Sequence, residues 1–399
     1  MHKQILKLFV ILLFALLVLY AVNGIVHDLS MPRHSEDFQW SPSKIFWSGR
    51  NPYKLWLSGN PTGEMILSQQ PNYLPLLYVL LFPFAHLDFS AAKLAWAATN
   101  FAFLAFTYAM ASRLFDLRGT RRLVGLALFL ASRPTIHVFE NGQHSLLILA
   151  AFVASIYVSR REGNRTLETG VPTRKRLGVS ALLAGFTYAK YSFAPSLASA
   201  YLLRHGWRYL LVTMIPAVAA LAFSWIWIGS DVSLTEFVML PLKVASTYRL
   251  SPGAGDLLTV LQNTIAESGW SRILAMVCCF LLAIAVPAFS GHKAGSMEFW
   301  SFASVASLTF VTHLRYDYVF YLFPALLALR RINTSAGVLL AGLVAFQWWN
   351  WQSLIGLSID KTTIAGIGFL VNMFLLSVIK SMRSSTSCGP YNPPSHRAV

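Results

Sequence analysis

The chain has 399 residues, of which 55% are hydrophobic and only 12% are charged. A soluble domain carries about 25% charged residues, so this composition excludes an ordinary soluble protein and indicates an integral membrane protein. The net charge of +16 does not require a nucleic-acid partner, because membrane proteins collect Lys and Arg in their cytoplasmic loops.

Apolar runs recur along the whole chain. In chain order they occupy residues 5–26, 73–87, 91–112, 122–139, 143–159, 178–203, 207–229, 270–290, 297–312, 316–329, 334–357 and 363–380. Each is expected to be helical, since an open strand cannot satisfy its backbone in lipid. The first run is as long as a full span and no small-residue cleavage site follows it, so we expect an uncleaved anchor.

Two of these runs are not predicted to be single spans. The run 73–87 is short for a bilayer crossing and contains Pro75 and Pro83, so we expect a juxtamembrane helix at the outer interface. The run 178–203 carries Lys190 in its middle, five residues before Pro195. Two short helices that meet on the outer side fit this run better than one long span does.

The positive charges then set the topology. Arginine clusters at 113–122 and 160–177 are expected to be cytoplasmic, which leads to about 12 spans with both ends of the chain inside. In this arrangement all of the net charge lies on the cytoplasmic side. We predict an all-α, multi-pass protein of the plasma (inner) membrane, with one polytopic domain over residues 1–380.

The domain is expected to carry two outer loops, 27–90 with the juxtamembrane helices and 230–269. Residues 381–399 are rich in Ser and Pro and are expected to form a disordered cytoplasmic tail. No internal repeat is visible, which argues against a transporter built from repeats.

The cysteines and acids do not indicate a metal or a disulfide framework. Cys278 and Cys279 lie in an apolar run, Cys388 lies in the tail, and no spacing suits zinc. No acidic cluster requires a divalent ion. We therefore expect no metal and no cofactor.

Polar residues gather at the outer ends of several predicted helices. They are Arg133, His137, Glu140, Asn141, Gln143, His144, Lys190, His313, Arg315 and Asp317. A single ionisable residue at this depth is often only a snorkelling side chain, but such groups are expensive in a membrane and usually mark a site. Their concentration on one side indicates a shared polar cavity.

The residue types suggest a chemistry. Cations at an outer membrane surface suit a phosphate whose tail stays in the lipid, and a carboxylate can take a proton from an attacking hydroxyl. Glu36 and Asp37 follow the first span directly, and their alternative reading is a solvated loop. Lys190 and Arg315 are the candidate cations. For Lys190, the alternatives are snorkelling and pairing with an acid such as Asp317.

Several segments resemble glycosyltransferase family 87. "EDFQWSPSKIFWSGRNPY" resembles its Asp-Phe followed by Gly-x-x-Pro-Tyr, and "YLPLLYVLLFPFAHL" its Tyr-x-Pro-Leu segment. "ENGQHSLLILA" is similar to its Gly-Gln-Asn turn, and "AGFTYAKYSFAPSLASAYLLRHGWR" to its Lys-x-x-Pro helix pair. The resemblance runs from residue 27 to about 210, with a weaker echo at "THLRYDYVFYLFPALLAL". The chain departs at Leu74-Pro75, where the family has Pro-Pro, and at His144, where it has Asn.

The resemblance implies a GT-C fold and sugar transfer from a polyprenyl-phosphate donor, often of mannose, on the outer face. It places Asp37 at the catalytic base and Lys190 at the phosphate-facing lysine. Arg315 and His313 are expected to join Lys190 at the donor phosphate. The expected sugar or acceptor pocket comprises Glu36, Tyr53, Tyr73, Arg133, Glu140, Asn141, Gln143 and His144.

The implied reaction inverts the anomeric centre and moves a hexosyl group to a lipid or glycan acceptor. Two other classes stay open from the sequence: a transporter or flippase of an anionic lipid, and a non-catalytic membrane subunit. Asp37 separates them, because only an enzyme needs a base there.

Overall fold

The structure is a computed structural model. It describes residues 12, 15–20, 22–24, 26, 38–67, 69–169, 174–229, 231–247, 255–264, 269–349 and 361–382. Within these ranges the chain forms only helices and their connections, which confirms the all-α class. Glu36, Asp37, half of the first apolar run and nearly all of the tail lie outside the described residues.

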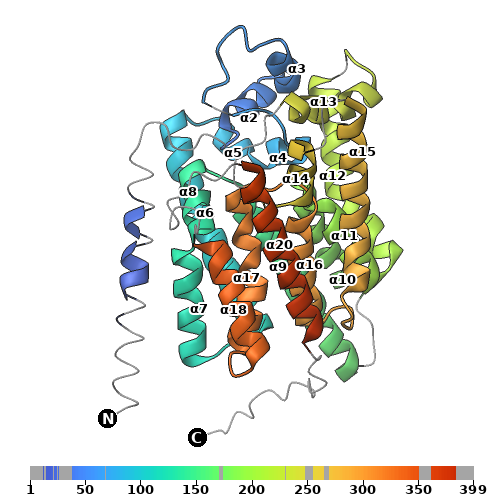
Figure 1. The fold of residues 1–399 in the computed structure, drawn as a ribbon. Coiled ribbons are helices and arrows are strands. Elements are labelled where there is room, and N and C mark those ends of the chain that lie inside the picture. The colour runs from blue at the N-terminus through green and yellow to red at the C-terminus, as the bar shows by residue number, and fades with distance from the viewer. Residues whose placement is uncertain are drawn as a thin grey trace, which may run out of the picture.

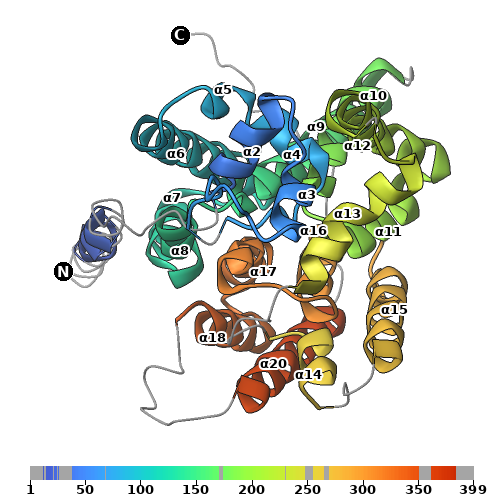
Figure 2. The ribbon, with the colours of Figure 1, turned by 90° about the horizontal axis from the view of Figure 1, so that it is seen from above.

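The long helices stand side by side in a bundle, and a layer of short helices covers one end (Figures 1 and 2). Among the described residues, four helical segments are long and apolar enough to cross a membrane. They are α6 (Phe89–Leu114), α12 (Trp207–Ile228), the segment Trp270–Phe289 formed by α15 (Gly269–Ala285) with the 3-10 turn η2 (Val286–Phe289), and Thr362–Ser381 within α20 (Lys361–Ser381). The number of about 12 spans and the orientation of both ends stay predictions.

Of the other predicted spans, 143–159 lies mostly in the long helix α9 (Ser145–Thr169), and most of the rest are short or broken in the structure. The shorter elements are α7 (Gly119–Ala131), α8 (Arg133–Asn141), α10 (Arg174–Gly185), η1 (Phe186–Ala189), α11 (Ala194–His205), α16 (Met297–Thr309), η3 (Arg315–Tyr321), α17 (Leu322–Arg330) and α18 (Ser335–Trp348). The run 122–139 was expected as one helix but bends by 46° between α7 and α8, which together would make a fifth span. Ser132 caps α8 there, and Pro134 lies in its first turn.

The run 178–203 breaks at Lys190, as predicted. Helix α10 passes into the turn η1, Lys190 is extended, and α11 begins with Pro195 in its first turn. Proline suits this position because the first-turn N–H groups have no partner within the helix. Gly185 lets the chain approach α12 closely, since a Cβ there would lie 2.3 Å from the carbonyl oxygen of Thr213.

The layer at one end consists of α2 (Trp40–Trp47), α3 (Pro52–Leu57), α4 (Pro75–Leu80), α5 (Phe82–Ala85), α13 (Leu234–Thr247) and α14 (Leu257–Thr264). The run 73–87 is therefore two short helices, neither of which can cross a bilayer. The segment expected as the second outer loop carries α13 and α14. Lys54 pairs with Asp231, and the amide of Asn51 donates to the carbonyl of Ile228 at 3.4 Å, which joins the two segments that were predicted as outer loops.

The main core lies among α9, α11, η3 and α17. Phe193 stacks on Phe320 with ring centroids 4.2 Å apart, and Phe152 lies 5.7 Å from Phe320. A second aromatic core lies under the layer of short helices. There Phe38 stacks on Trp96 at 5.5 Å and is completely buried. The two cores fix the helix ends between which the polar residues gather.

The connections from α6 to α7 and from α17 to α18 lie at the opposite end of the bundle (Figure 1), and basic residues occur in and beside them. Arg331 pairs with the buried Glu298 at 3.2 Å, and Arg121 donates to the amide oxygen of Asn333 at 3.5 Å. Arg160 donates to the carbonyl of Leu114 at 2.9 Å. This distribution is what the positive-inside rule predicts for a cytoplasmic end.

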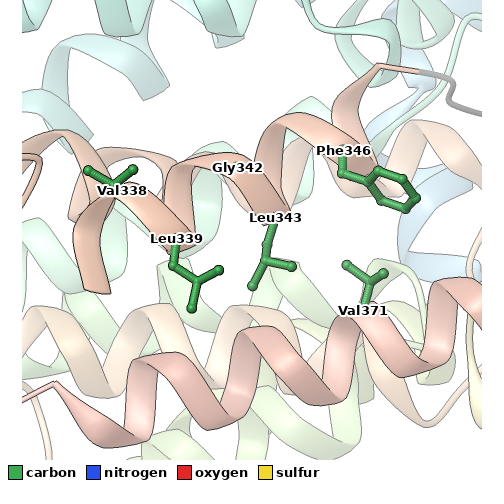
Figure 3. Close-up of a pocket in the computed structure, with 6 residues that line it drawn as sticks. All are labelled: Val338, Leu339, Gly342, Leu343, Phe346 and Val371. Atoms are coloured by element: carbon green, nitrogen blue, oxygen red, sulfur yellow. The ribbon is translucent and has the colours of Figure 1, made fainter. Parts of the chain in front are cut away.

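An apolar groove of about 450 Å³ runs between α18 and α20 (Figure 3). Its lining residues are Val338, Leu339, Gly342, Leu343, Phe346 and Val371. None of these side chains can bind a sugar hydroxyl or a phosphate. The candidate chemistry therefore lies elsewhere.

Candidate functional site

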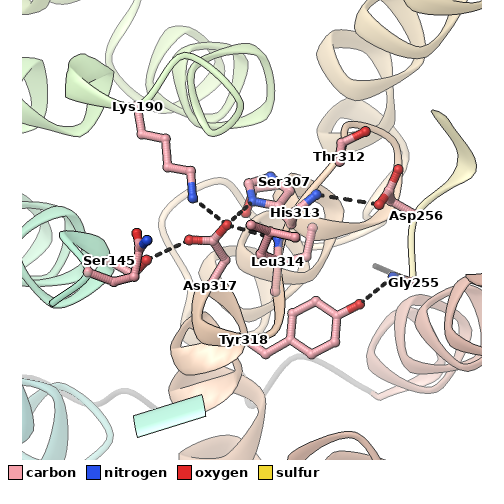
Figure 4. Close-up of polar contacts among 12 residues, drawn as sticks. Ser145, Lys190, Gly255, Asp256, Ser307, Thr312, His313, Leu314, Asp317 and Tyr318 are labelled. Atoms are coloured by element: carbon pink, nitrogen blue, oxygen red, sulfur yellow. Dashed lines mark hydrogen bonds and ion pairs between the residues drawn. The ribbon is translucent and has the colours of Figure 1, made fainter. Parts of the chain in front are cut away.

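The candidate site is a buried ionic cluster around Asp317, on η3 (Figure 4). One carboxylate oxygen of Asp317 accepts from the ammonium of Lys190 at 2.5 Å and contacts Nδ1 of His313 at 3.0 Å. The other accepts from the hydroxyl of Ser145 at 2.5 Å. The cluster thus joins the first residue of α9, the break before α11 and the start of η3.

The local fold explains why Asp317 lies there. Its carboxylate also accepts from the backbone N–H of Leu314 at 3.3 Å, which caps the first turn of η3. An anion is favourable at this end of a helix, where the N–H groups have no helical partner. The capped turn points the carboxylate at the break in the neighbouring chain.

Lys190 is enclosed by aromatic rings as well as by the carboxylate. Its ammonium lies 4.8 Å from the ring centroid of Tyr316, 5.8 Å from that of Phe193 and 6.0 Å from that of Tyr73. The structure therefore shows the pairing with Asp317 that the sequence left open. An ammonium has three N–H donors, so this ion pair does not prevent Lys190 from also binding a phosphate oxygen.

His313 lies beside Lys190 and is 1% exposed. Its ring is 4.4 Å from that of Phe193, and its backbone N–H donates to Asp256 at 3.4 Å. Nε2 of the ring has no hydrogen-bond partner among the described residues. Arg315, at the start of η3, lies in electrostatic reach of Arg133 on α8.

Four of the predicted pocket residues, Tyr53, Tyr73, Gln143 and His144, meet next to this cluster. The hydroxyl of Tyr73 donates to the amide oxygen of Gln143 at 3.0 Å, and the hydroxyl of Tyr53 donates to the carbonyl of Tyr73 at 2.8 Å. The buried ring of His144 lies 5.4 Å from that of Tyr73 and 5.0 Å from that of Trp96. The structure thus brings four predicted residues together.

The remaining predicted pocket residues form a second group on α8. Arg133 donates to Nε2 of His137 at 3.1 Å and lies 3.8 Å from Glu140, which also pairs with His137. The amide of Asn141 donates to the carbonyl of His137 at 3.1 Å. Helix α8 packs against η3, the element in which Arg315 lies.

Glu36 and Asp37 lie outside the described residues. The residue after Asp37 in the chain is Phe38, which stacks on Trp96 and lies 6.5 Å from the ring of His144.

Sequence reasoning missed Ser145, Trp96 and Asp256 as parts of the site. Asp256 offers a local signal, since an Asp three residues before Thr259 at the start of an apolar run is a helix cap. Ser145 and Trp96 offer none.

These observations define a class of protein: a membrane helical bundle with a buried cluster of ionisable side chains around a carboxylate. Residues 72–314 of the chain match the family model of glycosyltransferase family 87. The match covers more than half of the chain, so the protein belongs to glycosyltransferase family 87 and is a membrane glycosyltransferase. The matched range includes Lys190 and His313 and begins after Asp37. No curated protein and no solved structure matches the chain.

Proposed function

We propose that the protein transfers a hexosyl group, in the first place mannosyl, from a polyprenyl-phosphate sugar to a lipid or glycan acceptor. The observation that carries this proposal is the cluster of Lys190, His313 and Asp317, buried between broken helices beneath the outer layer. Ionisable groups at such depth usually serve a ligand or a reaction.

The cluster suits the donor on chemical grounds. A polyprenyl-phosphate sugar has an apolar tail for the lipid and one anionic phosphate that needs cations near the membrane surface. As the glycosidic bond breaks, the departing phosphate gains negative charge. The fixed cations Lys190 and Arg315, with a hydrogen bond from His313, stabilise this state more than the ground state.

Buried polar atoms support a sugar pocket next to the cations. Nε2 of Gln143 has no hydrogen-bond partner among the described residues, and the ring nitrogens of His144 have no side-chain partner there, only the backbone of Phe38 nearby. Buried polar groups usually have partners, because an unmade hydrogen bond costs about 1–3 kcal/mol. Sugar hydroxyls would supply partners to these atoms.

The proposed base is Asp37, which the family resemblance suggests. In the proposed step its carboxylate takes the proton of the acceptor hydroxyl, and the acceptor oxygen attacks the anomeric carbon from the side opposite the phosphate. The bond to the phosphate oxygen breaks and polyprenyl phosphate leaves, so the configuration inverts. The next residue after Asp37 in the chain, Phe38, has a buried ring that stacks on Trp96.

The proposed place of reaction is the outer face of the plasma (inner) membrane, the periplasmic side where one exists. The basic end of the bundle is then cytoplasmic, and α2 to α5 lie outside. Family membership favours transfer over the alternative of a lipid transporter or flippase, in which the same cations would hold an anionic lipid without chemistry.

The experiment combines donor binding with transfer by the purified protein. Polyprenyl-phosphate mannose and extracted membrane lipids are supplied in detergent, and glycolipid formation is followed. Lys190→Ala and Arg315→Ala are expected to weaken donor binding, and Lys190→Arg is expected to keep part of the activity. The control is Arg118→Ala, at an exposed position at the other end of the bundle, and it should have no effect. If both alanine variants bind donor as the wild type does, the phosphate site lies elsewhere.

A further inference from the structure

Asp317 has no part in the proposed reaction so far, yet it contacts two of the residues that would bind the donor phosphate. We propose that Asp317 is a positioning residue, which holds the ammonium of Lys190 and the imidazole of His313 so that both reach one phosphate. This inference rests on the proposed function and adds a residue to it.

The geometry concentrates several donors on one carboxylate. Lys190, His313 and the N–H of Leu314 all meet one oxygen of Asp317, at 2.5, 3.0 and 3.3 Å. Ser145 donates to the other oxygen. The side chain of Asp317 is fully buried, and a buried carboxylate persists only when paired and hydrogen-bonded in this way.

Lys190 gains orientation from this contact. It lies at the extended break between η1 and α11, and its ammonium ends a flexible four-carbon stem. The ion pair fixes one of its three N–H donors on Asp317, and the rings of Tyr316 and Tyr73 limit where the others can point.

His313 gains orientation as well. A contact between Nδ1 and a carboxylate fixes the ring and leaves Nε2 on the far side, the arrangement that also orients metal-binding histidines. Nε2 is buried and has no partner among the described residues. Asp256 also fixes the backbone at His313, because its carboxylate accepts from the His313 N–H at 3.4 Å. The same carboxylate caps α14 by accepting from the N–H of Thr259 at 2.8 Å.

The charge of Asp317 also predicts how binding and turnover separate. Replacement by Asn removes the resident counter-ion of Lys190, so the donor phosphate becomes the partner that remains. Donor affinity should therefore hold or rise, while the misplaced ammonium and imidazole stabilise the departing phosphate poorly. A residue with only a structural role would reduce binding and transfer together.

The test compares Asp317→Asn with Glu298→Gln in the full-length purified protein. Glu298 is also a buried acid with a cation partner, Arg331, but it lies at the other end of the bundle. We expect Asp317→Asn to lower transfer at saturating donor at least about tenfold, a difference of about 1.4 kcal/mol in the barrier, with donor Kd unchanged or lower. Glu298→Gln should keep both at wild-type values once folded.

A double-mutant cycle tests whether Asp317 acts through Lys190. In a Lys190→Met background, Asp317→Asn should cost much less transfer than it does in the wild type, because coupled residues are not additive. Additive losses, or a parallel loss of donor binding, would overturn the proposal.

Ser145→Ala covers the case in which Asp317→Asn does not fold. It removes only one hydrogen bond and keeps the charge, so transfer should fall a few-fold with donor binding kept. Unchanged transfer in Ser145→Ala would then count against the proposal. If the wild type itself transfers no sugar from the donor, the proposed function fails instead, so the two failures are distinct.

Discussion

Removing the hydroxyl of Tyr73 tests the pocket beside the ionic cluster. Tyr73→Phe keeps the ring, and with it the edge-on contact to His144 at 5.4 Å and the approach of Lys190 at 6.0 Å. It removes the donor to Gln143 at 3.0 Å. The amide nitrogen of Gln143 already has no partner among the described residues, so the substitution leaves this buried side chain with neither end satisfied.

The size of the effect follows from this geometry. Losing one buried hydrogen bond and stranding its acceptor costs about 1–3 kcal/mol of the free energy of unfolding. If Gln143 contacts the sugar, a free-energy cost of the same size raises the barrier to transfer. At about 1.4 kcal/mol for each tenfold, transfer should then fall by about fivefold to 140-fold.

Tyr201→Phe is the matched control. It also removes a buried hydroxyl, which shares a hydrogen bond of 2.9 Å with the hydroxyl of Ser155 between α11 and α9, and it leaves Gln143 and His144 untouched. Both variants should lose similar stability in denaturant titrations in detergent, and only Tyr73→Phe should lose transfer beyond about threefold, or ~0.6 kcal/mol. Equal transfer by the two variants would refute a direct role of the Tyr73–Gln143 contact.

Three further predictions concern packing, pH and topology. Gly255→Ala should destabilise the fold by about 1–3 kcal/mol in thermal unfolding, because its Cβ would lie 2.6 Å from the Tyr318 hydroxyl and 2.8 Å from Cα of Gly368. The control Gly342→Ala places its Cβ in open space and should be neutral or stabilising. The hydrogen bond from Arg50 lowers the pKa of Glu64 from 4.5 to about 2. The difference in the free energy of unfolding between the wild type and Glu64→Gln should therefore be constant near neutral pH and shrink as the pH falls from about 4.5 towards 2. A difference that grows in acid would contradict the pairing. In a cysteine-free background, Arg118→Cys should resist labelling from outside intact cells while Ser58→Cys on the outer layer is labelled; ready labelling at 118 would mean that the topology is inverted at that loop.

Local signals in the sequence predicted the parts of the fold that they control. A charge in the middle of an apolar run and a nearby proline predicted the break at Lys190, and two prolines predicted that 73–87 is no span. The bend at Ser132 had a similar signal, a capping residue followed by Pro134, but the apolar character around it favoured one continuous helix.

Contacts between distant segments could not be predicted in this way. Lys190 and Asp317 are 127 residues apart, and Ser145 and Asp317 are 172 apart. From the sequence, pairing of Lys190 with Asp317 was only one of several alternatives. Hydropathy predicts the depth of a residue in the membrane, but it does not predict which helices are neighbours. The link from Asp256 to His313 depends on how α14 packs against the bundle, which no motif in the chain encodes.

The most direct test of the proposed reaction is sugar transfer by the purified wild type and its Asp37→Asn variant, with polyprenyl-phosphate mannose as donor. The wild type should form a mannosylated product. The variant, which keeps the size of the side chain and loses its basicity, should transfer about 10²–10⁴ times more slowly while it binds donor as before. No product from the wild type with this donor, or near-normal transfer by the variant, would contradict the account.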